Sequence, residues 1–238
     1  MPASDDSPPL LPELRRALRR AGLDAAARQM QRDAEADGDD AGVFAFEPGL
    51  VSARVALAVL RRSTPAAVRA FITWSERPDV VPFLALDRQS VAPEMEREVD
   101  AFFESGPVID VVRYRLVREM LVKTDALARG ADLAIHALTA AILADEDHVP
   151  PDEQTPLDEV VPRLLGTRDA LAESIRGETE DVYTVLYHRV SVDAIEAYLR
   201  ALDAPAARWY HASIGRAWAD ALVESFREAA ALDDAEGD

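Results

Sequence analysis

Apolar residues recur every three or four positions along nearly the whole chain, which is the period of an α-helix with one buried face. Alternation of apolar and polar residues, the pattern of a half-buried strand, is scarce. The short apolar runs are rich in Ala and Leu rather than in the β-branched and aromatic residues that strands favour. The pattern therefore predicts an all-α fold of about ten helices with no sheet.

Proline and small hydroxyl residues mark several helix boundaries. Thr64 places a capping hydroxyl directly before Pro65, which predicts a helix that begins there. Ser191 precedes another segment of helical period, and Pro205 opens the last one. The longest segment of uninterrupted helical period is 107–144, so we expect one long central helix there, with other helices packed upon it.

Two segments of the chain match each other at an offset of 127 positions. Each contains a cap, a helix, a break with a proline and a second helix. Helical hairpins can resemble one another by chance, but a register shared by caps, apolar positions and prolines favours a duplicated helical unit. The matched pairs are Thr64 with Ser191, Val68 with Ile195, Phe71 with Tyr198, Ile72 with Leu199 and Pro78 with Pro205.

The apolar content, 49% of the residues, is sufficient for a core, and the length fits one large domain. We expect a single helical domain over 11–230, built from two related hairpin units. The predicted parts, in chain order, are a flexible segment over 1–10, a unit over about 11–144, an acidic loop over 145–156, a unit over about 157–230 and an acidic tail over 231–238.

The net charge narrows the function classes. With 26 basic and 44 acidic side chains, the chain carries a formal charge of −18, which argues against a nucleic-acid partner because such proteins need a basic surface. The sequence contains no apolar run of about 18 residues, so we expect no membrane span. It also contains no Cys, which excludes a thiol nucleophile and disulfide bonds.

Motifs of known catalytic sites are missing from the sequence. There is no Gly-rich phosphate loop, no G-x-S-x-G and no H-E-x-x-H, so we predict no catalytic residue, no cofactor and no metal site. One loop gathers oxygen ligands suited to a hard cation, but it lacks the spacing and the glycine of an EF-hand, and we interpret it as a solvated linker. Its residues are Asp145, Glu146, Asp147, His148, Asp152 and Glu153.

Aromatic residues concentrate in the C-terminal third of the chain. Tyr and Trp combine apolar area with a polar tip, which suits interfaces and pockets, although such residues can equally fill a core with their tips at helix ends. Tyr183 and Tyr187 lie one helical turn apart and share a face. The candidate partner- or ligand-binding residues are Tyr183, Tyr187, His188, Tyr198, Trp209, Tyr210 and His211.

The segments TPAAVRAFITWSERP (64–78) and VYTVLYHRVSVDAIEAYLRALDAPAARWYHA (182–212) resemble a bacterial, usually exported, all-helical family of unknown function. That family has two helical hairpins, each turning at an aromatic-x-x-Ser-Pro-x-Gly-Arg corner. Trp74 and Pro78 match the first corner, whereas Val80 stands in place of its glycine. The residues that match the second corner and its surroundings are Tyr187, Arg189, Tyr198, Pro205, Arg208, Trp209 and Tyr210, with Ala207 in place of the glycine.

The resemblance implies a helical fold and export but carries no activity. The first residues, MPASDDSPPL, are acidic and Pro-rich and lack the positive start and apolar segment of a secretory signal. The chain as written is therefore expected in the cytoplasm. If it is a mature form, as the resemblance implies, the expected location is the periplasm or the exterior.

Three functions from different classes remain open at this stage. The leading hypothesis is a non-catalytic helical module that binds a protein partner or has a structural role, because catalytic motifs are absent. The alternatives are a carrier of a small apolar ligand between helices and a hydrolase that uses the Tyr/His cluster. A large closed apolar cavity would favour the carrier, and a His within hydrogen-bond reach of a carboxylate in a pocket would favour the hydrolase.

Overall fold

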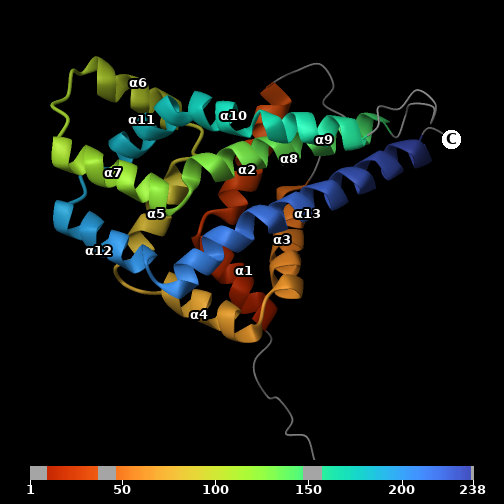
Figure 1. The fold of residues 1–238 in the computed structure, drawn as a ribbon, viewed down its shortest axis with the longest axis horizontal. Coiled ribbons are helices and arrows are strands. Elements are labelled where there is room, and N and C mark those ends of the chain that lie inside the picture. Colours follow the sequence, from red (N-terminus) through yellow and green to blue (C-terminus); the bar gives the residue numbers. More distant parts are fainter. Residues whose placement is uncertain (1–9, 37–46, 147–156, 237–238) are drawn as a thin grey trace, which may run out of the picture.

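The computed structural model describes residues 10–36, 47–146 and 157–236, and within these ranges it contains thirteen helices and no strand, which confirms the all-α prediction (Figure 1). The helices are α1 (Leu10–Arg20), α2 (Leu23–Ala36), α3 (Pro48–Arg62), α4 (Pro65–Ser75), α5 (Val81–Gln89), α6 (Met95–Glu104), α7 (Val111–Lys123), α8 (Ala126–Glu146), α9 (Leu157–Gly166), α10 (Arg168–Ser174), α11 (Arg176–Tyr187), α12 (Val192–Leu202) and α13 (Pro205–Glu236).

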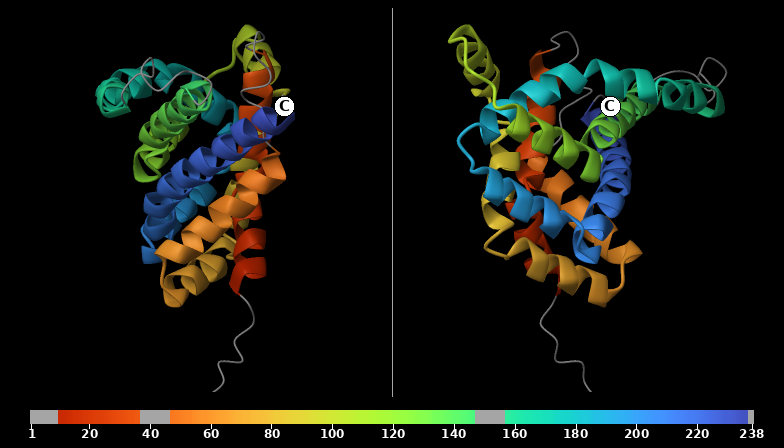
Figure 2. Two further views of the ribbon diagram at one scale, coloured as in Figure 1. Left: turned by 90° about the vertical axis from the view of Figure 1, so that its right-hand side faces the viewer. Right: turned by 60° about the vertical axis from the view of Figure 1, so that its left-hand side comes forward.

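One connected cluster of buried apolar side chains unites the fold into a single domain. It draws residues from α1, α2, α3, α4, α5, α7, α11, α12 and α13. The longest helix, α13, packs along both α8 and α3, and α4 lies at the opposite end of the molecule from α6 and α10 (Figure 2). The core therefore joins segments from both ends of the chain, so neither expected unit is buried by its own residues alone.

The expected long helix over 107–144 is two helices, and this prediction was wrong. The helix α7 ends at Lys123, and α8 begins at Ala126. Between them Asp125 adopts a φ of 52°, a left-handed conformation that Asp tolerates better than most residues. The hydroxyl of Thr124 donates to the carbonyl of Met120 and satisfies the end of α7. The apolar period passes through this turn without a Pro or Gly, so no local signal predicted a break there.

The two predicted caps are confirmed and have the same geometry. Thr64 accepts a hydrogen bond from the main-chain N–H of Ala67 at 3.3 Å, and Ser191 accepts one from Ala194 at 3.3 Å. In both cases the hydroxyl satisfies an N–H that lacks a partner in the first helical turn. The helices that follow, α4 and α12, have 11 residues each.

Two aromatic stacks hold these hairpins against each other. The ring of Phe71 on α4 stacks on Tyr210 of α13, with centroids 4.6 Å apart and planes 8° from parallel. The ring of Phe83 on α5 stacks on Tyr198 of α12, at 4.2 Å and 5°. The first helix of each hairpin therefore packs against the second helix of the other.

The ends of the expected domain fall partly on residues outside the described ranges. The expected N-terminal segment lies there except for residue 10, which begins α1, and so does the acidic loop beyond residue 146. The residues of the expected acidic tail belong to α13 as far as Glu236. In the described residues, no helix combines the length and the apolar character that crossing a membrane requires.

Candidate functional site

The seven candidate aromatic and histidine residues do not form one surface. Tyr187 and Tyr198 are completely buried in the core, and Tyr210 is buried as well. Trp209 is only half-buried and packs against the core from its edge. Because Tyr187 and Tyr198 expose no area, a partner has no access to them in this conformation.

Three of the seven line one half-open pocket, whereas His188 lies elsewhere. Tyr183, Tyr210 and His211 face a cavity of about 280 Å³ between α2, α5, α8, α11 and α13, which we call the α5–α8–α13 pocket. Its apolar wall includes Leu23, Leu133, Ile214 and Trp218, and its polar wall adds Asp87 and Arg129. The pocket thus combines an apolar lining with a small group of polar side chains, as ligand sites do.

Asp87 lies in the last turn of α5 and presents a carboxyl group to this pocket. Burial raises the pKa of Asp87 to about 6, and the charges of Arg129 and Arg88 and a hydrogen bond from Tyr183 only partly offset that effect. The Tyr183 hydroxyl donates to Asp87 Oδ1 at 3.3 Å. Asp87 is therefore a carboxyl group that exchanges its proton near neutral pH.

Tyr183 stays protonated under all ordinary conditions. Its pKa is raised far above its usual value of 10, first by burial and then by the nearby carboxylate of Asp87. The hydroxyl therefore acts as a hydrogen-bond donor to Asp87 rather than as a base. It belongs to α11, so this bond also joins α11 to the end of α5.

His211, on the second turn of α13, has no protein partner for either ring nitrogen within the described part of the chain, although both atoms are buried. Burial lowers the pKa of His211 well below 6.5, and the positive charge of Arg129 lowers it further. The imidazole is thus neutral at physiological pH and offers one N–H donor and one acceptor. Its ring is held against that of Tyr210, with centroids 5.0 Å apart.

Arg129 supplies the fixed charge of the site from the first turns of α8. Its Nε is also buried without a partner among the described residues. Its charge acts on Asp87, Tyr183 and His211, which places the guanidinium among these groups. A guanidinium keeps its proton in proteins, so this cation is permanent.

The turn between α1 and α2 closes one side of the pocket. Gly22 in this turn has a φ of 91°, a conformation that residues with a Cβ rarely adopt. A Cβ at Gly22 would stand 3.4 Å from Cγ of Arg88, the residue that follows Asp87. Arg88 in turn donates to the carbonyl of Arg20, which fastens the turn to the end of α5.

Among the described residues, the hydrogen bonds of the pocket do not pair a histidine with a carboxylate. The carboxyl of Asp87 is engaged by Tyr183, and His211 has no hydrogen bond to a carboxylate in the described structure. The dyad that would favour a hydrolase is therefore not formed by these residues. The pocket is also half-open and partly polar, unlike the closed apolar cavity expected of a carrier for a wholly apolar ligand.

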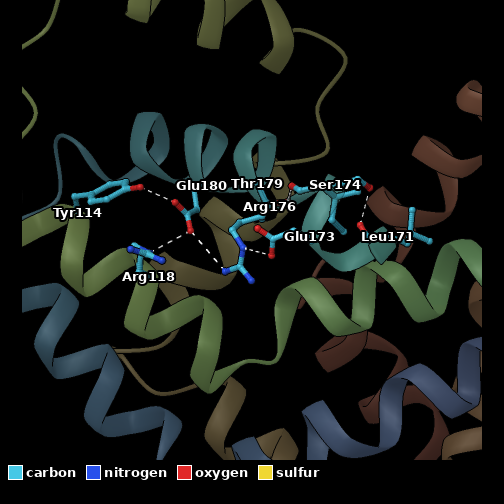
Figure 3. A network of polar contacts seen from close by, with 9 residues as sticks. Tyr114, Arg118, Leu171, Glu173, Ser174, Arg176, Thr179 and Glu180 are labelled. Atoms are coloured by element: carbon cyan, nitrogen blue, oxygen red, sulfur yellow. Dashed lines mark hydrogen bonds and ion pairs between the residues drawn. The ribbon is translucent and has the colours of Figure 1, made fainter. Parts of the chain in front are cut away.

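A second polar cluster joins α7 to α11 and has a structural role (Figure 3). The Tyr114 hydroxyl donates to Glu180 Oε2 at 2.5 Å, and Arg118 Nε lies 3.2 Å from Glu180 Oε1. Arg176 Nη1 approaches the same oxygen at 4.0 Å, and its Nε pairs with Glu173. Both carboxylate oxygens of Glu180 thus have partners, and the cluster fastens α11 to α7.

His188 lines a smaller cavity at the other side of α11. That cavity has a volume of about 100 Å³ and is bordered by Phe102, Tyr114 and the segment 107–110. Nδ1 of His188 is bonded to the carbonyl oxygen of Val185. Val108 beside it is fully exposed, and Asp110, Arg113 and Thr184 add polar groups to the lining of the cavity.

Sequence reasoning missed Asp87 and Arg129, although each left a signal. Asp87 follows the buried Phe83 by one helical turn, and Arg129 lies between Ala126 and Leu133 on the inward stripe of its helix. A charge on the apolar stripe of a helix indicates a functional or paired group, because burying a charge is costly.

Comparison of this chain with models of protein families, with curated proteins and with solved structures found no match.

Proposed function

We propose that this protein is a non-catalytic binding protein that holds a small ligand in the α5–α8–α13 pocket. One observation carries the proposal. Six polar side-chain atoms of the described residues are buried without a partner, and three of them, both ring nitrogens of His211 and Nε of Arg129, belong to this pocket. A buried polar group without a hydrogen bond costs about 1–3 kcal/mol, so a ligand that supplies the partners recovers this energy.

The walls of the pocket define the rest of the ligand. Leu23, Leu133, Ile214 and Trp218 accept an apolar body, while the polar groups stand together and accept one polar end. The volume of about 280 Å³ lies just below the usual range for small-molecule sites, about 300–1,000 Å³. The ligand is therefore a small amphipathic molecule rather than a wholly apolar one.

A pair of glycines offers a matched test of binding in this pocket. Gly215 lines the pocket, and a Cβ built on it meets no atom within 4 Å. Gly177 on α11 is equally open but is not part of the lining. Gly215→Leu should therefore fill the pocket, whereas Gly177→Leu should change only the surface.

The experiment titrates the protein with 1-octanol, octanoate and octylamine and follows binding by calorimetry and by tryptophan fluorescence, since Trp218 lines the site. We expect saturable binding of at least one probe, loss of that binding in Gly215→Leu and normal binding in Gly177→Leu. If no probe binds, or if Gly215→Leu binds as the wild type does, the proposal fails.

The protein-interaction hypothesis has one supporting observation at a different place. Val108, Val111 and Val122 are exposed to 100%, 79% and 77%, around the start and end of α7. Large apolar side chains exposed on one helix and the segment before it are a feature of interaction sites when they lie together. A second proposal is therefore that α7 and the segment before it contact a protein partner, which a Val108→Asp, Val111→Asp double variant should abolish in a co-purification experiment without unfolding the protein.

We also infer that the domain consists of two related units, as the sequence repeat and the resemblance to the exported helical family suggested. The first support is the equal length and equal capping of α4 and α12. The second is the reciprocity of the two stacks, because the offset of 127 that relates Phe71 to Tyr198 also relates Phe83 to Tyr210. The Phe of each stack therefore corresponds to the Tyr of the other stack.

The helices that precede the hairpins extend this correspondence. The turn between α1 and α2 and the turn between α7 and α8 each have two residues, and the second, Gly22 or Asp125, has a positive φ. Just before them, Arg20 pairs with Glu76 at 2.9 Å, and Lys123 pairs with Asp203 at 2.7 Å. The acidic partners, like the hairpins, are 127 positions apart. These paired features support units that begin at α1 and α7.

A further inference from the structure

The α5–α8–α13 pocket contains one charge that cannot change and one that can. Arg129 remains a cation at any ordinary pH, whereas the carboxyl of Asp87 can take up a proton. The site can therefore become more positive but has no group that would make it more negative near pH 7. Building on the proposed ligand-binding function, we propose that the ligand is a small organic carboxylate with an apolar body, bound by Arg129 and His211, and that Asp87 takes up a proton when it binds.

The unpartnered atoms match the acceptors of a carboxylate. Of the three unpartnered atoms, Nε of Arg129 and one nitrogen of His211 are donors, and the other nitrogen of His211 is an acceptor. Two donors can serve two carboxylate oxygens, and bonds from Arg to a carboxylate are among the stronger ones. A cationic ligand would instead lie beside Arg129 and leave the Arg129 donor unused.

Burial of Asp87 favours its protonated form, whereas the positive charges of Arg129 and Arg88 oppose proton uptake. Two arginines, four neutral tyrosines and a neutral histidine face Asp87 from α5, α8, α11, α12 and α13. The turn before α2 contributes only uncharged residues. A bound carboxylate adds a second negative charge near Asp87. Repulsion between two neighbouring carboxylates raises the pKa of one of them, so Asp87 takes up a proton. The charged and titratable groups are Arg88, Arg129, Tyr183, Tyr187, Tyr198, Tyr210 and His211.

Packing alone does not require the polar groups of the pocket. Under the proposed two-unit relation, the offset of 127 makes Ala56 correspond to Tyr183 and Leu84 to His211. Aligning the α1–α2 turn with the α7–α8 turn makes Ala26 correspond to Arg129. Ala56 and Leu84 are buried apolar side chains in their own unit. The fold thus accommodates apolar residues at these places, and their polar counterparts are gathered around one pocket, as expected for residues that serve a ligand.

Three probes with the same eight-carbon chain test the ligand class: octanoate, 1-octanol and octylamine. Calorimetry at pH 6 should rank octanoate above octanol and octanol above octylamine. Between pH 7 and 8 the association constant of octanoate should fall by about tenfold per pH unit, because binding consumes a proton, while that of octanol should not change. Titrations in two buffers of different ionisation enthalpy should show the uptake of close to one proton per octanoate.

Two variants separate the roles of the charges. Asp87→Asn resembles the protonated carboxyl, so octanoate binding should become independent of pH and stronger than in the wild type at pH 8. Arg129→Gln should weaken octanoate binding by about tenfold or more, since it removes a charged hydrogen-bond donor, and should weaken the binding of the uncharged octanol much less. Arg97→Gln is the control, because Arg97 is exposed and lies outside the pocket lining. Circular dichroism and melting temperature establish that each variant is folded.

The outcomes distinguish this proposal from the proposed function beneath it. If octanol and octanoate bind equally well, if octylamine binds best, or if octanoate binding is independent of pH in the wild type, the carboxylate proposal is overturned while ligand binding in the pocket stands. If none of the three probes binds, both fail. If Arg129→Gln does not fold, the pH profile of Asp87→Asn and the proton count still decide the matter.

Discussion

The indole Nε1 of Trp74 donates a hydrogen bond of 3.0 Å to the main-chain carbonyl oxygen of Ala201. The two residues are 127 positions apart, which is also the offset between the hairpins, so corresponding positions of α4 and α12 meet. Ala201 lies in the last turn of α12, and its carbonyl oxygen also accepts the main-chain N–H of Ala204 at 3.2 Å. The bond therefore joins the two hairpins, and it also gives the buried indole N–H of Trp74 an acceptor.

This bond predicts a graded loss of stability at position 74. Trp74→Phe keeps most of the ring but removes the donor, and should lower the free energy of unfolding by about 1–2 kcal/mol. Trp74→Ala leaves a cavity and should cost about 3–5 kcal/mol. Urea unfolding monitored by circular dichroism measures both. Trp209→Ala is the comparison, and it should cost less because Trp209 is only half-buried; an equal loss would contradict this account.

The hairpins were predictable from sequence because their signals are local. A hydroxyl cap, a proline and an apolar stripe act within one or two turns, and Thr64, Ser191 and Pro205 each mark the expected boundary in the structure. The break at Asp125 was not predictable in this way. Its left-handed backbone is fixed by how α7 and α8 pack, while the apolar period on either side stays in phase.

The candidate site was predictable only in part, for a related reason. Tyr183, Tyr210 and His211 attract attention as aromatic residues, whatever their surroundings. Asp87 and Arg129 lie in different parts of the chain, and only the tertiary fold brings α5, α8 and α11 around one pocket. Local periodicity specifies which face of each helix is buried but not which faces meet.

The α1–α2 turn provides a second stability prediction. Gly22→Ala should destabilise the protein by about 1–2 kcal/mol, because the φ of 91° disfavours a residue with a Cβ. Gly177→Ala should instead stabilise it slightly, by up to about 1 kcal/mol, since this helical glycine has open space around it. Chemical denaturation of both variants measures the difference, and a stabilising effect of Gly22→Ala would rule out the left-handed turn.

The two-unit proposal predicts equal costs at corresponding positions. Phe71→Leu and Phe83→Leu each remove one of the reciprocal stacks, and stacked aromatic pairs contribute about 0.5–1.5 kcal/mol beyond their buried area. We expect the two losses of unfolding free energy to agree within about 1 kcal/mol. A large loss for one variant and none for the other would show that the stacks are not equivalent, and would count against the relation between the units.

The bidentate pair between Asp132 of α8 and Arg168 of α10 predicts a loss of stability in acid. The hydrogen bond from Arg168 holds the pKa of Asp132 below 3.8, despite some opposing effect of burial. The folded state therefore gains from the charged carboxylate at every pH above about 4 and loses that gain as the pH falls below it. Asp132→Asn should cost less than about 1 kcal/mol at pH 7, because the pair is partly exposed, and should cost less at pH 3 than at pH 7.

Asp87 predicts the opposite pH dependence. In the unfolded chain its carboxyl loses a proton near pH 3.8, but in the folded protein burial keeps the proton until about pH 6. Between these values the folded state binds more protons than the unfolded state, so the contribution of Asp87 to stability falls as the pH rises and is constant above pH 7.

The variant Asp87→Asn removes this loss of stability. Compared with the wild type, the variant should be similar at pH 3.5 and more stable at pH 7.5, by at most about 3 kcal/mol, since one pKa unit corresponds to about 1.4 kcal/mol. Denaturation curves of both proteins at the two pH values give the difference directly. A wild type that gains stability over the variant between pH 4 and 7 would mean that the carboxylate is well solvated or firmly paired, and the buried acid of the pocket would then not exist.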